Sequence, residues 1–170
     1  MRNSILVESP VGAILVCEED GAIVSVSQGN PAFRAAGRAG LLLRRAEREL
    51  GQYFAGKRRD FELPLRPGGS RFDRSVWEAM VRIPFGSTMT YGDVALALDT
   101  SPRAVGGACA RNPIPIFIPC HRILGAGGAL GGYTWCDGIA TKQFLLKLEG
   151  VELLGPIAAL ARGVRALRSA

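Results

Sequence analysis

Residues 91–110, YGDVALALDTSPRAVGGACA, predict two short helices separated by a turn. The first helix is expected from about Tyr91 to Leu98. The second is expected to begin after Ser101, whose hydroxyl can cap a helix, with Pro102 at the first helical position and its end near residue 110. Two helices in this arrangement have the outline of a helix-turn-helix, whose second helix enters the major groove of DNA.

The second of these helices is unusual because Gly106-Gly107-Ala108 presents almost no side chain. A face of small residues lets another backbone approach closely, and in a DNA-binding protein that backbone is the duplex. The charge points the same way, with 21 Lys and Arg against 15 Asp and Glu and a formal net charge of +6. A basic balance favours a polyanionic partner, although a basic surface without any nucleic-acid role gives the same number.

The segment before this motif predicts a helix and, before that, a linker. Phe72, Val76, Met80 and Ile83 fall on one face of a helix that Pro84 is expected to end. Residues 56–70 are interrupted by prolines and glycines, so they are expected to connect two domains.

The first third of the chain predicts a strand meander followed by a helix. Short apolar, β-branched runs at residues 4–7, 13–17 and 22–26 alternate with turn sequences. Residues 35–54 then carry apolar side chains at helical spacing. The charged residues of this helix are expected to form one solvated face; they are Arg44, Arg45, Glu47, Arg48 and Glu49.

Composition excludes several classes of protein. Of the 170 residues, 48% are hydrophobic and 21% charged, which is typical of a folded globular protein. The N-terminus does not resemble a signal peptide, and the uncharged stretch 123–136 is broken by glycines, so no membrane span is expected. We expect a cytoplasmic protein in a bacterium or archaeon, or a nuclear one in a eukaryote.

The cysteines and the single histidine point to thiol chemistry and away from a disulfide framework or a zinc site. No two of the four cysteines are spaced as a CxxC pair; they are Cys17, Cys109, Cys120 and Cys136. Cys120 lies directly beside His121 and Arg122 at the end of a proline-rich apolar run. A buried cysteine is usually an inert small hydrophobe, whereas adjacent cations would lower its pKa from about 8.5 toward neutrality. Position alone does not identify a carboxylate that could orient the imidazole.

The string Ile118-Pro119-Cys120-His121-Arg122 resembles the active-site motif of the O6-alkylguanine-DNA alkyltransferases. That family repairs alkylated guanine by moving the alkyl group to its own cysteine. Residues 103–108, Asn112-Pro113, Gly132-Tyr133 and Leu148-Glu149-Gly150 resemble the other motifs of the family in order and spacing. The resemblance covers about residues 72–150, and the N-terminal meander is compatible with the less constrained first domain of the family.

The resemblance implies a set of catalytic residues. Cys120 would accept the alkyl group, His121 would act as a base through a water, and Glu149 would orient and stabilise the imidazole. Asn112 would brace the turn between the recognition helix and the active-site loop. Tyr91 would crowd the target nucleotide and hydrogen-bond its base.

The resemblance also implies a substrate pocket. Tyr133 and Thr134 would lie on the loop that closes it, with the hydroxyl of Thr134 near the guanine oxygen. The backbone of Cys120 and Ile123 would read the guanine amino group. Trp135 would either line this pocket or pack beneath its loop.

The DNA contacts follow from the same comparison. Arg103 would enter the duplex and fill the space of the extruded nucleotide. The residues expected to contact DNA are Arg103, Ala104, Gly106, Gly107, Arg111 and Arg122.

These observations predict an α+β protein with two domains. Residues 1–69 would form a small β-sheet plus helix domain with its linker, RNase H-like by resemblance. Residues 70–155 would form a mostly helical, winged helix-turn-helix-like domain for DNA binding and alkyl acceptance, and residues 156–170 a basic tail or helix. Some family members hold zinc in the first domain, but Cys17 has no plausible partners here, so no metal or cofactor is expected.

The expected function is stoichiometric dealkylation of O6-alkylguanine in double-stranded DNA by a monomer. Two alternatives remain open. A lesion-sensing protein without repair activity would share the DNA-binding motifs, but it would not need Cys120. A cysteine hydrolase would use the Cys120-His121 pair, but it would leave the helix-turn-helix unexplained.

Overall fold

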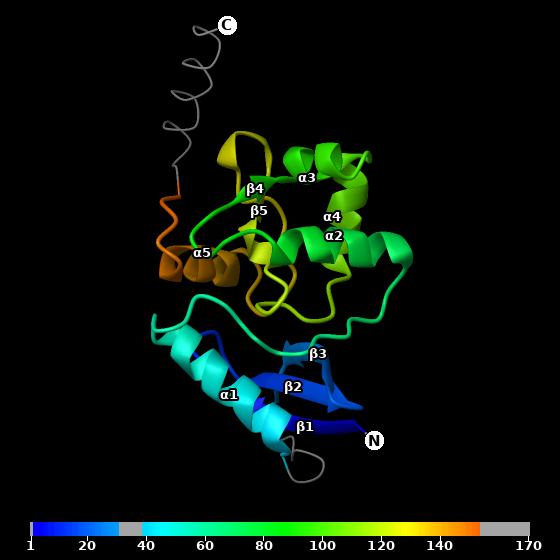
Figure 1. Cartoon of the computed structure of the whole chain (residues 1–170). Coiled ribbons are helices and arrows are strands. Elements are labelled where there is room, and N and C mark those ends of the chain that lie inside the picture. The colour runs from blue at the N-terminus through cyan, green and yellow to red at the C-terminus, as the bar shows by residue number, and fades with distance from the viewer. Residues whose placement is uncertain (1, 31–38, 154–170) are drawn as a thin grey trace, which may run out of the picture.

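The computed structural model describes residues 2–30 and 39–153, which form an α+β architecture with a sheet domain and a helical domain (Figure 1). The sheet consists of β1 (Arg2–Val7), β2 (Ile14–Glu19) and β3 (Ala22–Gln28), which pair antiparallel in sequence order. Asp20 and Gly21 join β2 to β3 with φ values of 47° and 77°. Two left-handed residues match the twist of a two-residue hairpin, which explains why this Asp-Gly pair makes the turn.

Helix α1 (Leu41–Phe54) packs on one face of this sheet. Its buried positions include Leu43, Ala46 and Leu50, which face the sheet residues Ile14 and Val16 in one core. The helix begins later than the predicted residue 35, because Gly40 is extended with φ −69° and ψ 176°. The predicted residues 35–38 lie outside the described part of the chain.

The prediction that the charged residues of α1 form one solvated face is wrong at Glu49. This side chain is 1% exposed and lies within 2.8 Å of Arg45 and 3.6 Å of Arg58. Its carboxylate also accepts a hydrogen bond from the backbone of Glu62. The position therefore faces inward, and two guanidinium groups compensate its charge.

The connecting segment runs along the outer edge of β3. Ile23 donates its N–H to the carbonyl of Pro64, and Arg66 donates to the carbonyl of Ile23, each at 2.8 Å. Further along the same strand, Val26 donates to the carbonyl of Pro113 in the helical domain. The linker and the second domain thus cover an edge that would otherwise be free to pair with another chain.

The helical domain contains four α-helices among the described residues, together with two short strands and two 3₁₀ turns. The elements are α2 (Arg71–Val81), β4 (Met89–Thr90), α3 (Tyr91–Ala97), α4 (Pro102–Ala110), η1 (Cys120–Arg122), β5 (Ile123–Leu124), η2 (Ala126–Gly128) and α5 (Ile139–Leu148). The short strands β4 and β5 pair in parallel. Helix α2 ends with Arg82 as its C-cap, two residues before Pro84, because a proline disfavours helical geometry in the residue before it.

The predicted helix-turn-helix is confirmed as α3 and α4, which pack against each other. The hydroxyl of Ser101 accepts a hydrogen bond from the Ala104 N–H at 3.2 Å, as expected of an N-cap. Trp77 of α2 is core, as predicted, and donates its indole N–H to the carbonyl of Ala108 at 2.9 Å. These contacts fix the recognition helix α4 to the domain.

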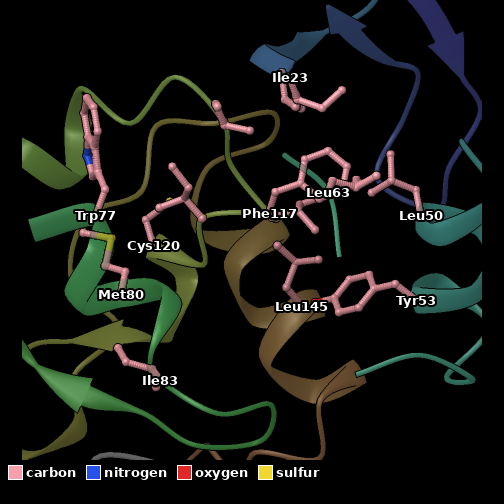
Figure 2. Close-up of a cluster of buried hydrophobic side chains, with 14 of the residues drawn as sticks. Ile23, Leu50, Tyr53, Leu63, Trp77, Met80, Ile83, Phe117, Cys120 and Leu145 are labelled. Atoms are coloured by element: carbon pink, nitrogen blue, oxygen red, sulfur yellow. The ribbon is translucent and has the colours of Figure 1, made fainter. Parts of the chain in front are cut away.

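One apolar core continues from the sheet domain into the helical domain (Figure 2). Tyr53 of α1, Phe61 of the linker and Phe117 of the loop between α4 and η1 meet through ring contacts at centroid distances of 5.3 and 4.7 Å. Leu145 of α5 joins this cluster, and Cys120 lies among the buried side chains of Figure 2. The fold therefore places the thiol inside the protein, in the part of this core that the helical domain forms.

Within residues 2–30 and 39–153, no helix has the length and apolar character needed to cross a bilayer. The predicted basic tail or helix at residues 156–170 lies outside the described part of the chain.

The N-cap of α4 can be tested by replacing Ser101 with Ala. Loss of the hydroxyl leaves the Ala104 N–H without its acceptor, so the free energy of unfolding in urea should fall by about 1 kcal/mol. Ser101→Thr keeps an acceptor oxygen and serves as the control. Equal stability of Ser101→Ala and the unmodified protein would show that the cap does not stabilise this helix.

Candidate active site

The centre of the site is the carboxylate of Glu149, the residue that caps the C-terminus of α5. Its Oε1 lies 2.8 Å from His121 Nε2 and accepts hydrogen bonds from Tyr53 at 2.8 Å and from Arg122 Nη2 at 3.0 Å. Its Oε2 accepts from Arg122 Nε at 2.8 Å and from the Gly86 N–H at 3.2 Å. The described residues thus give this buried anion five hydrogen bonds, as a buried charge requires.

Gly86 must be a glycine for this arrangement. Its φ is +76°, and a Cβ at this position would lie 2.9 Å from the backbone oxygen of Glu149. The close approach lets the Gly86 N–H reach the Glu149 carboxylate. The loop after α2 is thereby held against the end of α5.

The charges of this group follow from burial and hydrogen bonding. Burial alone would raise the pKa of Glu149, but the hydrogen bonds from His121 and Arg122 and the charge of Arg122 outweigh it and bring the pKa to about 2. Burial lowers the pKa of His121, and the attraction of Glu149 does not fully offset it. The imidazole is therefore neutral, and it donates from Nε2 because the carboxylate can only accept.

The second ring nitrogen of His121 is available for chemistry. Its Nδ1 is buried and has no hydrogen-bond partner among the described residues. A neutral imidazole that donates from Nε2 presents a lone pair at Nδ1. This atom can accept a proton directly or through a water.

The backbone that presents Cys120 and His121 is shaped by Asn112, at the turn after α4. Its side chain donates to the carbonyl of Ile118 at 2.9 Å and accepts from the N–H of Ile114 at 3.0 Å. Ile116, between these two partners, has a φ of 72°. One side chain thus closes a loop that a β-branched residue strains, a geometry that fits the bracing role implied for Asn112.

The Cys120 thiol is neutral, contrary to the expectation of a lowered pKa. Burial raises its pKa, and the opposing influences of Asn112, Tyr133 and Lys142 do not cancel that effect. The sequence argument assumed two neighbouring cations. In the structure burial favours the uncharged form of His121, and the charge of Arg122 is engaged by Glu149.

Cys120 opens into a cavity of about 510 Å³ between α4 and the loop after η2. The lining includes the predicted residues Tyr91, Gly106, Asn112, Tyr133 and Thr134. Burial raises the pKa of Tyr91 to about 12, so its phenol is protonated and can donate. The cavity therefore brings together a thiol, a proton donor and an aromatic surface.

Trp135, for which the sequence allowed two positions, lines this cavity together with Cys109. Cys109 was not predicted as a pocket residue. It lies at the C-terminal end of α4, and burial raises its pKa to about 12. Cys109 is therefore a poor nucleophile beside the candidate acceptor.

Lys142 is a second residue that sequence reasoning missed. It is fully buried, and its ammonium donates to the carbonyls of Ile123 and Leu130 at 2.6 and 2.5 Å. It also lies 6.0 Å from the ring centroids of both Tyr91 and Tyr133. A lysine on a helix with apolar neighbours gives no sequence signal that separates it from a solvated one.

The predicted DNA contacts divide into exposed and buried groups. Arg103 is exposed on α4, while Ala104, Gly106 and Gly107 of the same helix are partly exposed. Arg111 has an exposed side chain (59%) whose Nε and Nη2 both donate to Oδ1 of Asp73.

Arg122 requires a correction. Its side chain is 7% exposed, with Nε and Nη2 bound to Glu149 and Nη1 bound to the carbonyl of Ile83. A phosphate cannot reach this guanidinium. The residue stabilises the carboxylate instead of contacting DNA.

No three His, Cys, Asp or Glu side chains of the described residues cluster as a metal site would require. Cys17 is a free thiol buried in β2.

The charge state of Glu149 can be tested by Glu149→Gln. The change leaves Arg122 without its anion, so at neutral pH we expect a loss of roughly 3–5 kcal/mol in the free energy of unfolding. The pKa of Glu149 in the folded protein is lower than its ordinary value of 4.5. The stability that the ionised carboxylate contributes is therefore fully present above pH 4.5 and is lost as the pH falls toward about 2. Urea unfolding should show the difference between the two proteins narrowing across this range.

Glu47→Gln provides the matched control, because Glu47 is an exposed carboxylate of α1. Its difference from the unmodified protein should stay small at every pH. A Glu149→Gln difference that is constant with pH would contradict the assignment of a buried, ionised carboxylate.

Two family models match the chain, one to each domain. The 6-O-methylguanine DNA methyltransferase DNA-binding domain matches residues 71–151, and the ribonuclease-like domain of the same protein matches residues 4–67.

Full-length relatives agree with these matches. The methylated-DNA–protein-cysteine methyltransferase of Methanosarcina acetivorans is 43% identical over 150 residues, covering 84% of this chain and 95% of the relative. The constitutive enzyme of Bacillus subtilis is 37% identical over 154 residues, covering 85% and 93%.

Solved structures show the same fold. Mycobacterium tuberculosis O6-methylguanine methyltransferase is similar with a TM-score of 0.78 and 33% identity, covering 88% of this chain and 93% of that one. Mycobacterium tuberculosis OGT in complex with DNA gives a TM-score of 0.75 and 32% identity, covering 88% and 92%. With both domains matched and relatives aligned over nearly their whole length, this chain belongs to the O6-methylguanine DNA methyltransferase family.

Proposed function

We propose that this protein repairs O6-methylguanine in DNA by transferring the methyl group to its own Cys120. The observation that carries the proposal is the position of this thiol. It lines a cavity shared with Tyr91 and Tyr133, and the next residue is a neutral histidine held by a buried carboxylate. The protein is a methylated-DNA–protein-cysteine methyltransferase, and its relatives of that name support the assignment.

The reaction is a displacement at the methyl carbon. The sulfur of Cys120 forms a bond to this carbon as the bond from carbon to guanine O6 breaks. The thiol proton passes to Nδ1 of His121 through a water, and the guanine anion that departs takes a proton from the Tyr91 hydroxyl. The imidazolium that forms returns a proton to the tyrosinate through solvent, so the net products are a thioether and guanine.

The neutral resting state suits this reaction. A thiolate formed only when the substrate is bound is not lost to other electrophiles. Glu149 stabilises the imidazolium that forms, because its carboxylate lies 2.8 Å from Nε2. A thioether does not hydrolyse, so each molecule acts once and needs no cofactor.

The substrate is double-stranded DNA carrying an O6-alkylguanine, and the protein acts as a monomer. A methyl group inside a stacked duplex cannot reach a thiol at the base of a cavity, so the nucleotide must be flipped out. Exposed Arg103 lies on α4, the helix that also contributes Gly106 to the cavity. This position supports a role for Arg103 in filling the space that the nucleotide leaves, while the partly exposed glycines let the DNA backbone approach. Ala104 and Arg111 contact phosphates beside it.

The two domains have different roles in this proposal. Residues 1–69 support the site, and residues 70–155 bind DNA and accept the alkyl group. The limits of the two family matches support this division. Bacterial and archaeal relatives support a cytoplasmic location in a prokaryote.

The alternatives explain less of the structure. A lesion sensor has no use for a thiol beside a buried His121-Glu149 pair. A cysteine hydrolase does not account for the helix-turn-helix.

Replacement of Cys120 by Ser tests the acceptor. Methyl transfer from duplex O6-methylguanine should be abolished, because an alcohol forms far too little alkoxide at neutral pH. Binding of the same duplex, measured by fluorescence anisotropy, should be retained. Intact-mass measurement should show one added methylene in the unmodified protein and in a Cys136→Ser control. A methylated Cys120→Ser protein would mean that another residue is the acceptor.

Replacement of Arg103 by Ala separates nucleotide flipping from chemistry. Single-turnover transfer from duplex should slow by roughly tenfold to hundredfold, or about 1.4–2.8 kcal/mol, since flipping costs a few kcal/mol. Reaction with free O6-methylguanine base should be unaffected because nothing needs unstacking. Arg48→Ala, on the exposed face of α1, is the matched control. Equal losses on both substrates would show that Arg103 shapes the pocket.

A further inference from the structure

Tyr53 connects the sheet domain to the active site. It lies in α1, is fully buried, and donates its hydroxyl proton to Glu149 Oε1 at 2.8 Å across a sequence separation of 96 residues. Figure 2 shows the side chain extending from α1 toward Leu145 of α5. The bond crosses from one domain to the catalytic group of the other.

The geometry of this hydroxyl is fixed by its surroundings. The Tyr53 ring packs against Phe54, Phe61 and Phe85 at centroid distances of 5.4, 5.3 and 6.2 Å. Burial and the negative charge of Glu149 raise the pKa of Tyr53 far above its usual value. The phenol therefore stays protonated at neutral pH and donates to Glu149.

Tyr53 and His121 share one oxygen, since both contact Glu149 Oε1. A donor that takes electron density from this oxygen weakens the attraction between the carboxylate and the imidazole. The attraction is greater for imidazolium than for neutral imidazole, so a competing donor lowers the pKa of the ring.

Other groups also act on this ring. Arg122 contributes a cation from η1 and Lys142 one from α5, and both disfavour the imidazolium. Tyr133, on the loop before α5, lines the same cavity as Cys120. Among the groups named here that act on the His121 ring, Tyr53 is the one that comes from the sheet domain.

We propose that Tyr53 is a positioning residue for alkyl transfer, which acts through Glu149 to hold His121 as a neutral base. The inference rests on the proposed function, because it assigns His121 the role of accepting the thiol proton. It also gives the sheet domain a part in the chemistry: its helix α1 adjusts the basicity of a residue in the DNA-binding domain.

The test is Tyr53→Phe, which removes one oxygen and keeps the ring. His121 is the only histidine of the chain, so its nitrogen-bound proton can be followed without ambiguity by NMR. Loss of the competing donor should strengthen the bond from His121 Nε2 to Glu149 and move this proton resonance downfield. The acid limb of the single-turnover rate with free O6-methylguanine should shift to higher pH by about 0.5 to 1 unit, a threefold to tenfold change in the dissociation constant.

A merely structural role predicts a different profile. Phe61→Leu loosens the same aromatic cluster without touching Glu149, and it should lower the rate by the same factor at every pH. For Tyr53→Phe the rate should fall on the acid side only, with the alkaline plateau kept. An unmoved His121 resonance together with an unshifted acid limb would overturn the inference.

Failure of the proposed function would look different. An unmodified protein that never methylates Cys120 would refute the repair assignment, whatever the histidine spectrum shows. If the unmodified protein methylates Cys120 and its pH–rate profile is identical to that of Tyr53→Phe, only the role of Tyr53 is refuted.

Discussion

The structure depends on the compensation of one buried negative charge, the carboxylate of Glu149. A carboxylate in a protein interior is tolerated only when cations and hydrogen-bond donors surround it. Here the donors come from Tyr53 of α1, Gly86 after α2, and His121 and Arg122 of η1. Three stretches far apart in sequence must meet before this charge is stabilised. The same requirement therefore joins the two domains and assembles the catalytic residues.

This arrangement determines the form of the chemistry. Because Arg122 is committed to Glu149 and His121 is neutral, the two residues that follow Cys120 in the chain supply no free cation to ionise the thiol. Cys120 rests as a buried thiol, and its proton must leave during the reaction through His121. The carboxylate of Glu149 is already in position before the reaction, and it stabilises the positive charge that develops on the His121 ring.

Local sequence signals predicted the elements well, and the long-range contacts poorly. Ser101 marked the start of α4 correctly, because capping depends on a few neighbouring residues. The inward position of Glu49 and the buried pairing of Arg122 were missed, since periodicity does not reveal which distant group compensates a charge. Tyr53 falls within the helix predicted for residues 35–54, but helical spacing gives no sign of its hydroxyl's partner, which lies 96 residues away. The family motif identified Cys120, but not the protonation state that the fold imposes on it.

The central claim is that Cys120 is a protonated thiol in the resting protein and is activated only through His121. The most direct measurement is the ultraviolet absorbance of thiolate, recorded across a pH titration as the difference between the unmodified protein and Cys120→Ser. The account predicts no thiolate absorbance from Cys120 at neutral pH, with its appearance delayed to a higher pH than that at which an exposed thiol ionises. A clear thiolate signal at neutral pH would contradict it and would show that the site ionises its nucleophile before the substrate arrives.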